Sequence, residues 1–146
     1  MTTRVDIVQI ARSYIGTPFH HMGRLPGVGL DCAGVPVCCA RELALAPPDF
    51  DVPAYTQSPD GHSMIEWCDQ YMGGEIAKKD MQAGDMIVLI TDKYPQHLGI
   101  VANHVSGEFS IVHASTFGGM NRVVEHRLMF SRIQRFSAAY AFPGIA

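Results

Sequence analysis

The stretch Gly29-Leu30-Asp31-Cys32-Ala33-Gly34 decides how this 146-residue chain is interpreted. It places one cysteine between small residues, after a glycine-rich loop and before an apolar run with helical character. A thiolate nucleophile needs an open approach path and is stabilised by the positive end of a helix dipole. We therefore expect Cys32 to be an activated nucleophile at a helix start, with Asp31 as a hydrogen-bonding residue of that start.

Helical patterns come first in the chain and strand-like patterns follow, which is typical of an α+β protein. The apolar spacing predicts three helices, over 3–15, 32–45 and 63–72. Pro36 conflicts with a helix that begins at Cys32, so this helix is expected to start one or two residues later or to bend. Strands are predicted over 86–90, 98–103, 109–113, 121–125 and 140–142. These elements predict one domain over residues 1–146.

Two histidines in strand-like settings are candidate partners for Cys32. His97 precedes the apolar run 98–101, where a fixed backbone and an accessible ring suit a general base. His113 lies at the end of the 109–113 strand and can fix the tautomer of His97 if the two strands pair. Either histidine could equally be a structural residue. A cysteine with distant histidines is nevertheless the pattern of a cysteine hydrolase.

Other polar and sulfur-containing residues have weaker signals. Phe19, His20, His21 and Asp31, all before Cys32, are candidates for contacting the substrate or the oxyanion. Either of these two histidines could donate to an oxyanion, or both could be ordinary loop residues. The remaining histidines fall near turns or strand ends and are expected at the surface: His62, His104 and His126. The remaining cysteines are expected to be small buried hydrophobic residues: Cys38, Cys39 and Cys68.

Composition and charge argue against several classes of function. With 47% hydrophobic and 17% charged residues, the chain is an ordinary globular protein. A net charge of −3 without a basic face argues against nucleic acid as a partner. The longest apolar runs, such as 86–90, are too short to span a bilayer, and the N-terminus lacks the pattern of a secretory signal. The cysteine and histidine spacings favour neither disulfides nor zinc, so no metal or cofactor is expected.

Four motifs in consistent order resemble the NlpC family of papain-like cell-wall cysteine endopeptidases, from about Ile10 to Phe142. They are Gly16-Thr17-Pro18-Phe19 with Asp31-Cys32-Ala33-Gly34, then Ala83-Gly84-Asp85-Met86-Ile87, His97-Leu98-Gly99-Ile100-Val101 and Val112-His113-Ala114-Ser115. The resemblance implies a papain-like fold, in which the helix bearing Cys32 packs on an antiparallel sheet bearing both histidines. It implies Cys32 as the nucleophile, His97 as the base and His113 as the residue that orients it. The implied reaction is hydrolysis of an amide in the peptide stem of peptidoglycan, commonly after D-glutamate.

One departure from the family pattern keeps other functions open. The family usually has a tyrosine where Phe19 stands, so a hydroxyl that could hold an oxyanion is missing. The Thr17-Pro18-Phe19 run together with Gly27-Val28-Gly29 is similar to the branch found in phages, prophages and gene-transfer particles, which implies a tail component with tail proteins as partners. One alternative is a non-catalytic tail-assembly protein on the same fold. Another is an amidase or acyltransferase with the same Cys-His-His site, which an apolar cleft around Cys32 would favour.

Overall fold

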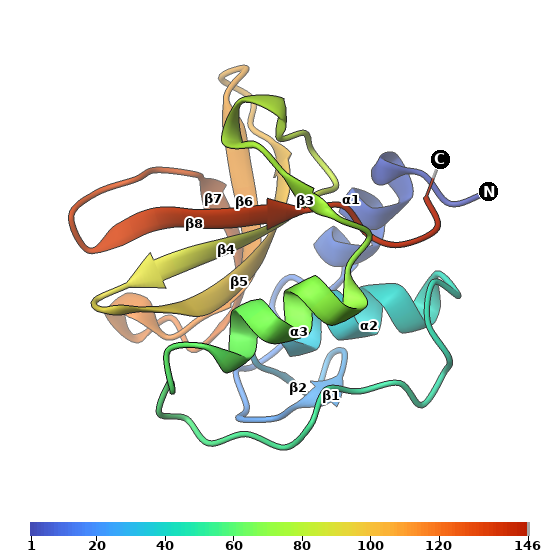
Figure 1. Ribbon diagram of the computed structural model, residues 1–146, viewed down its shortest axis with the longest axis horizontal. Helices are drawn as coiled ribbons and strands as arrows, with labels where there is room; N and C mark the ends of the chain where they lie inside the picture. The colour runs from blue at the N-terminus through green and yellow to red at the C-terminus, as the bar shows by residue number, and fades with distance from the viewer. Residues whose placement is uncertain (146) are drawn as a thin grey trace.

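The computed structural model describes residues 1–145, and it shows an α+β architecture with one large antiparallel sheet (Figure 1). The helices are α1 (Arg4–Ser13), α2 (Gly34–Glu42) and α3 (Ser63–Tyr71). The strand order of the large sheet is β3-β8-β4-β5-β6-β7. Its strands are β3 (Glu75–Ile76), β4 (Met86–Thr91), β5 (Tyr94–Asn103), β6 (Phe109–Ser115), β7 (Arg122–Arg127) and β8 (Gln134–Tyr140). A small hairpin of β1 (Arg24–Leu25) and β2 (Gly29–Leu30) precedes α2.

The helix starts follow from local hydrogen bonding. Thr3 caps α1 in a capping box, because its hydroxyl accepts from the backbone of Asp6 while the Asp6 carboxylate accepts from the backbone of Thr3. The second helix begins at Gly34, two residues after Cys32, as the position of Pro36 predicts. Pro36 therefore falls in the first turn, where a backbone N–H has no partner within the helix and its absence costs little.

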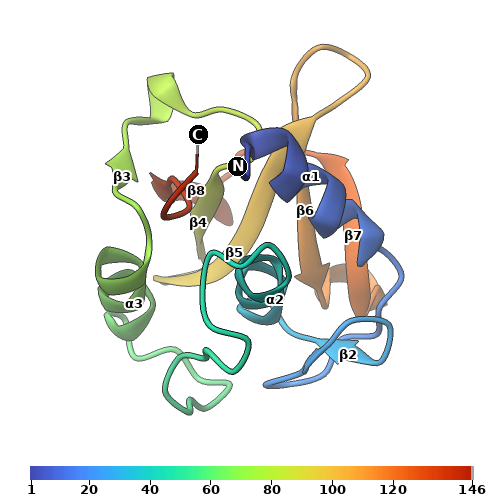
Figure 2. The same cartoon turned by 90° about the vertical axis from the view of Figure 1, so that its right-hand side faces the viewer.

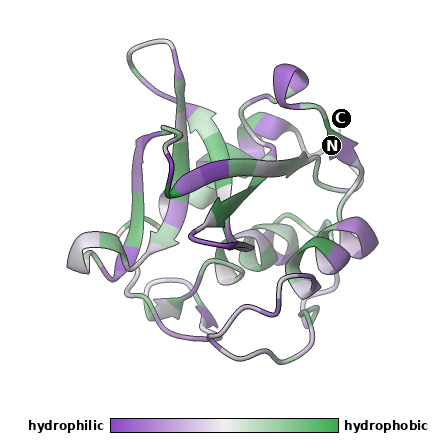
Figure 3. Ribbon diagram, turned by 60° about the vertical axis from the view of Figure 1, so that its left-hand side comes forward, coloured by the Kyte–Doolittle hydropathy of each residue, from purple (hydrophilic) through white to green (hydrophobic). Residues whose placement is uncertain are grey.

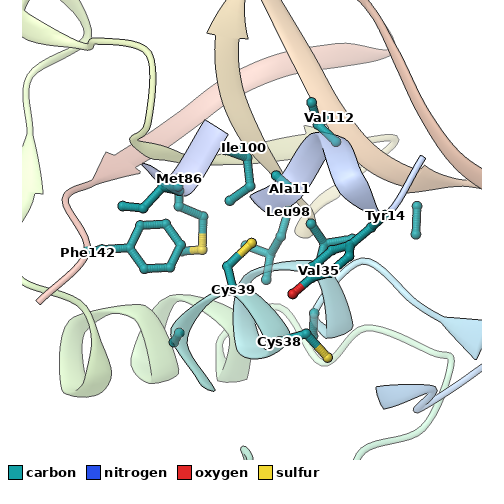
Figure 4. Close-up of a cluster of buried hydrophobic side chains, with 14 of the residues drawn as sticks. Ala11, Tyr14, Val35, Cys38, Cys39, Met86, Leu98, Ile100, Val112 and Phe142 are labelled. Atoms are coloured by element: carbon teal, nitrogen blue, oxygen red, sulfur yellow. The ribbon is translucent and has the colours of Figure 1, made fainter. Parts of the chain in front are cut away.

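Side chains from the three helices and one face of the sheet form the main core. The strands alternate, so that Val88, Leu98 and Val112 face the helices while Ile87 and Ile111 face the opposite side. Figure 4 shows the helix-facing core, including Cys38 and Cys39 of α2. The smaller cluster on the other face has less cover, and Figure 3 shows hydrophilic segments along the outer strands. Cys38, Cys39 and Cys68 are buried free cysteines, which confirms that expectation.

The structure corrects several predicted strand boundaries. β5 begins at Tyr94 rather than at residue 98, and β6 continues to Ser115, so both candidate histidines lie inside strands. The largest error concerns β8, of which only the last residue falls in the predicted 140–142 strand. Its first half is polar and partly exposed, so it lacks the apolar alternation that predicts a strand. β8 nevertheless lies between β3 and β4, near one edge of the sheet (Figure 1).

Candidate active site

Cys32 lies in a cleft of about 710 Å³ between the start of α2, the 54–60 loop and the first half of β5. The residue is partly exposed, and its sulfur lies 3.9 Å from the carbonyl oxygen of Gln96. The thiol therefore contacts the residue just before His97, and His97 itself lines the same cleft. The sequence-predicted nucleophile and base are brought together at one site.

Asp31 organises the floor of this cleft. It is almost fully buried, and its Oδ1 accepts from the backbone N–H of Gly34 at 2.9 Å, which confirms its predicted role at the helix start. The Arg24 guanidinium donates to the same oxygen at 2.8 Å. The other carboxylate oxygen accepts from the backbone N–H of Met22 at 2.8 Å and from the hydroxyl of Tyr55. Four donors thus tie the loop before Cys32, the helix start and the cleft wall to one carboxylate.

Three histidines, one on each of β5, β6 and β7, form a row that begins at His97 in the cleft. His97 of β5 and His113 of β6 are joined through Nε2 and Nδ1 at 2.5 Å, with ring centroids 4.8 Å apart. His113 is in turn joined to His126 of β7 through the two Nε2 atoms at 2.8 Å. Figure 2 shows these three strands side by side. His126 is exposed, as expected, but its residue type and setting did not predict its contact with His113.

The titration behaviour of the site departs from the expected ready-made thiolate. Burial, together with the neighbouring Asp31, raises the pKa of Cys32 to about 11, although backbone N–H groups and the Arg24 charge oppose the rise. Burial lowers the pKa of His97 to about 4 and that of His113 to about 3. A thiol and two imidazoles that are all neutral at pH 7 are therefore the resting state. Burial of the thiol thus opposes the thiolate that its place before a helix was expected to favour.

The other sequence-predicted residues have different positions. Phe19 and His21 line the cleft, whereas His20 is exposed and lies outside the set of cleft residues. The ring of His21 is engaged with the carbonyl oxygen of Tyr55 at 3.2 Å, so its Nε2 carries the proton and donates to that oxygen. Neither histidine therefore points an unengaged donor at Cys32. No hydrogen bond within residues 1–145 uses the backbone N–H of Cys32, which leaves it available to an oxyanion.

Tyr55 is the cleft residue that sequence reasoning missed. It belongs to a loop interrupted by prolines, where no periodic pattern indicates a fixed position. Its ring packs against Trp67 of α3 and edge-on against His21, and its hydroxyl is held by Asp31 and Arg24. Burial raises the pKa of this phenol, so it remains protonated. The loop is thereby fixed over the cleft by long-range contacts.

In residues 1–145, none of the helices has the length and apolar character that crossing a membrane requires. Over the same residues, no group of three His, Cys, Asp or Glu side chains is arranged to hold a metal ion.

Comparison with solved structures gives several neighbours over nearly the whole chain. The NlpC/p60 domain of the peptidoglycan hydrolase SagA has a TM-score of 0.62 and 20% identity, over 97% of this chain and 100% of that one. The fold is that of NlpC/p60 domains. NlpC2 from Trichomonas vaginalis has a TM-score of 0.66 and 18% identity over 97% of this chain, which spans 47% of that protein.

A further neighbour is an N-acetylmuramoyl-L-alanine amidase from Bacteroides uniformis. Its TM-score is 0.58 at 12% identity, over 96% of this chain and 98% of that one. No family model matches the sequence, and no curated protein matches it significantly. The predicted papain-like α+β fold is therefore confirmed by structure.

Proposed function

We propose that this protein is a cysteine peptidase that hydrolyses an amide bond in the peptide stem of peptidoglycan. The observation that carries the proposal is the Cys32 sulfur, 3.9 Å from the carbonyl oxygen of Gln96, in an open cleft that His97 also lines, with His113 joined to His97. Neighbours on this fold include a peptidoglycan hydrolase and an N-acetylmuramoyl-L-alanine amidase, which supports the substrate class. The sequence resemblance adds cleavage after D-glutamate and a role in a phage or prophage tail.

The chemistry starts from a neutral thiol and a neutral imidazole. As the Cys32 sulfur attacks the scissile carbonyl carbon, its proton passes to His97 and a C–S bond forms. The oxyanion accepts from the free backbone N–H of Cys32. The C–N bond then breaks, and the amine leaves with the proton from His97. Water next attacks the thioester and gives a proton to His97, which returns it to the departing sulfur, so the acid product and the free thiol are released.

The experiment is digestion of purified peptidoglycan followed by mass spectrometry of the released muropeptides. The wild-type protein is expected to produce stem fragments with a new amino terminus. Cys32→Ala should produce none, whereas Cys68→Ala, which removes a buried thiol of α3, should keep the wild-type pattern. Identical fragments from wild-type protein and Cys32→Ala would refute the proposal. Folded wild-type protein that releases nothing would favour a non-catalytic tail-assembly role.

A second cavity favours one alternative substrate class. It has a volume of about 350 Å³ and an almost entirely apolar lining between α2 and α3. It shares Ala33, Met64 and Trp67 with the cleft, so an apolar group bound there would lie beside the nucleophile. This arrangement suits an amidase or acyltransferase acting on a lipid or small apolar amide. Acylation of Cys32 by a long-chain p-nitrophenyl ester, but not by a short-chain one, would support this alternative.

A further inference from the structure

His126 extends the predicted pair of histidines into a relay of three. Strand register places it there: Ile111 pairs with His126 and His113 pairs with Val124, so the imidazoles of β6 and β7 meet diagonally on one face. The ring centroids are 4.8 Å apart and the ring planes are inclined by 73°. The preceding residue in the chain, Glu125, is bound to Ser110 and Arg12 instead. His126 is therefore the residue of β7 that contacts His113.

At His126, the far end of this row, the direction of hydrogen bonding is fixed. His126 Nδ1 lies 2.9 Å from the carbonyl oxygen of Arg127, and a carbonyl oxygen can only accept a hydrogen bond. The proton of a neutral His126 must therefore be on Nδ1, which leaves its Nε2 as an acceptor. His113 then donates from Nε2 and, being neutral as well, offers a bare Nδ1. His97 in turn donates from Nε2 to that Nδ1.

The other end of this chain of hydrogen bonds is His97, whose Nδ1 is the nitrogen that serves as the base. With its proton on Nε2, a neutral His97 has a bare Nδ1, and no hydrogen bond within residues 1–145 occupies that atom. A bare Nδ1 is what the base needs in order to take the proton of Cys32. If all these hydrogen bonds ran in the opposite direction, the proton of His97 would lie on Nδ1. The ring would keep its position but could not accept the proton of Cys32.

We propose that His126, anchored by the Arg127 carbonyl, is a positioning residue that sets the tautomers of His113 and His97. It acts through other residues and does not touch the substrate. The proposal rests on the proposed function of the site, but the tautomers can be measured whether or not peptidoglycan is cleaved. A third histidine thus gives the relay a direction that the Cys32, His97 and His113 set alone does not specify.

The test is a long-range ¹H–¹⁵N correlation spectrum of ¹⁵N-histidine-labelled protein at pH 8, which distinguishes protonated from bare ring nitrogens. We expect a proton on Nε2 of His97, on Nε2 of His113 and on Nδ1 of His126. A His97 ring that carries its proton on Nδ1, or a His126 ring that carries it on Nε2, would overturn the proposal. This readout needs only the folded wild-type protein and is independent of turnover.

Variants then connect the tautomers with the reaction. His126→Phe removes the acceptor and should mix the two tautomers of His97, with kcat reduced about 10- to 100-fold and KM little changed. His126→Gln offers an amide oxygen near the position of Nε2, so it should restore most of the wild-type tautomer pattern of His97 and most of kcat. The control is His104→Phe, at a turn where the ring contacts Ser106, and it should match wild type. If His126→Phe keeps the wild-type tautomers and kcat, the proposal is wrong.

Discussion

Replacing Asp31 with alanine should destabilise the fold by an amount that the structure defines. The variant removes the acceptor of four hydrogen bonds and leaves the guanidinium of Arg24 largely buried. Removing one partner of a buried ion pair costs about 3–5 kcal/mol. Arg24 keeps a contact with Asp51 at 3.0 Å, so we expect a value near the lower end, about 3 kcal/mol.

The assay is urea unfolding followed by circular dichroism. For an m-value of about 1–3 kcal/mol/M, a loss of about 3 kcal/mol lowers the midpoint by about 1–3 M. The matched control is Asp49→Ala on the exposed loop after α2, which should change the free energy of unfolding by less than about 0.5 kcal/mol. Combining Asp31→Ala with Arg24→Leu should cost less than the sum of the two single changes. A loss below about 1 kcal/mol for Asp31→Ala, or strict additivity in the double variant, would refute this reasoning.

Three more expectations concern the relay and its setting. Because the pKa values of His97 and His113 are lowered to about 4 and about 3, the unfolded chain takes up protons first, so stability should fall as pH drops from about 6.5 toward 4. Urea midpoints at pH 7 and pH 4.5 measure this loss of stability. An equal loss in a variant that carries both His97→Gln and His113→Gln would contradict the expectation. With the pKa of Cys32 near 11, its iodoacetamide alkylation rate should rise about tenfold per pH unit between pH 7 and 10, whereas a plateau below pH 8 would indicate a preformed thiolate. Gly99→Ala would place its Cβ 2.4 Å from Ile111, so we expect a loss of about 1–3 kcal/mol in denaturant unfolding, and an unchanged midpoint would show that the strands can move apart.

Local chemistry made part of the fold predictable. The delayed start of α2 follows from Pro36, because proline acts within one helical turn. The apolar runs at 86–90 and 98–103 likewise predicted the core of β4 and β5. β8 was largely missed because its first residues are polar, and only pairing with β4 makes them a strand.

The candidate site, too, could be predicted from the sequence only in part. Cys32, His97 and His113 could be selected from residue type and setting, and the structure brings them to one region. His126 could not, because an exposed histidine near a strand end is ordinary, and only the β6–β7 register turns it toward His113. The position of Tyr55 could not be predicted either, because it depends on Asp31 and Arg24, which are 24 and 31 residues away in the chain.

The central claim is that Cys32 forms the covalent intermediate. The most direct measurement is acid quenching of the protein during turnover of a purified stem peptide, followed by peptide mapping with mass spectrometry. We predict an acyl group joined as a thioester to the tryptic peptide that contains Cys32, and no adduct in Cys32→Ala. Product release by Cys32→Ala at the wild-type rate, or an acyl group on any other residue, would contradict the account.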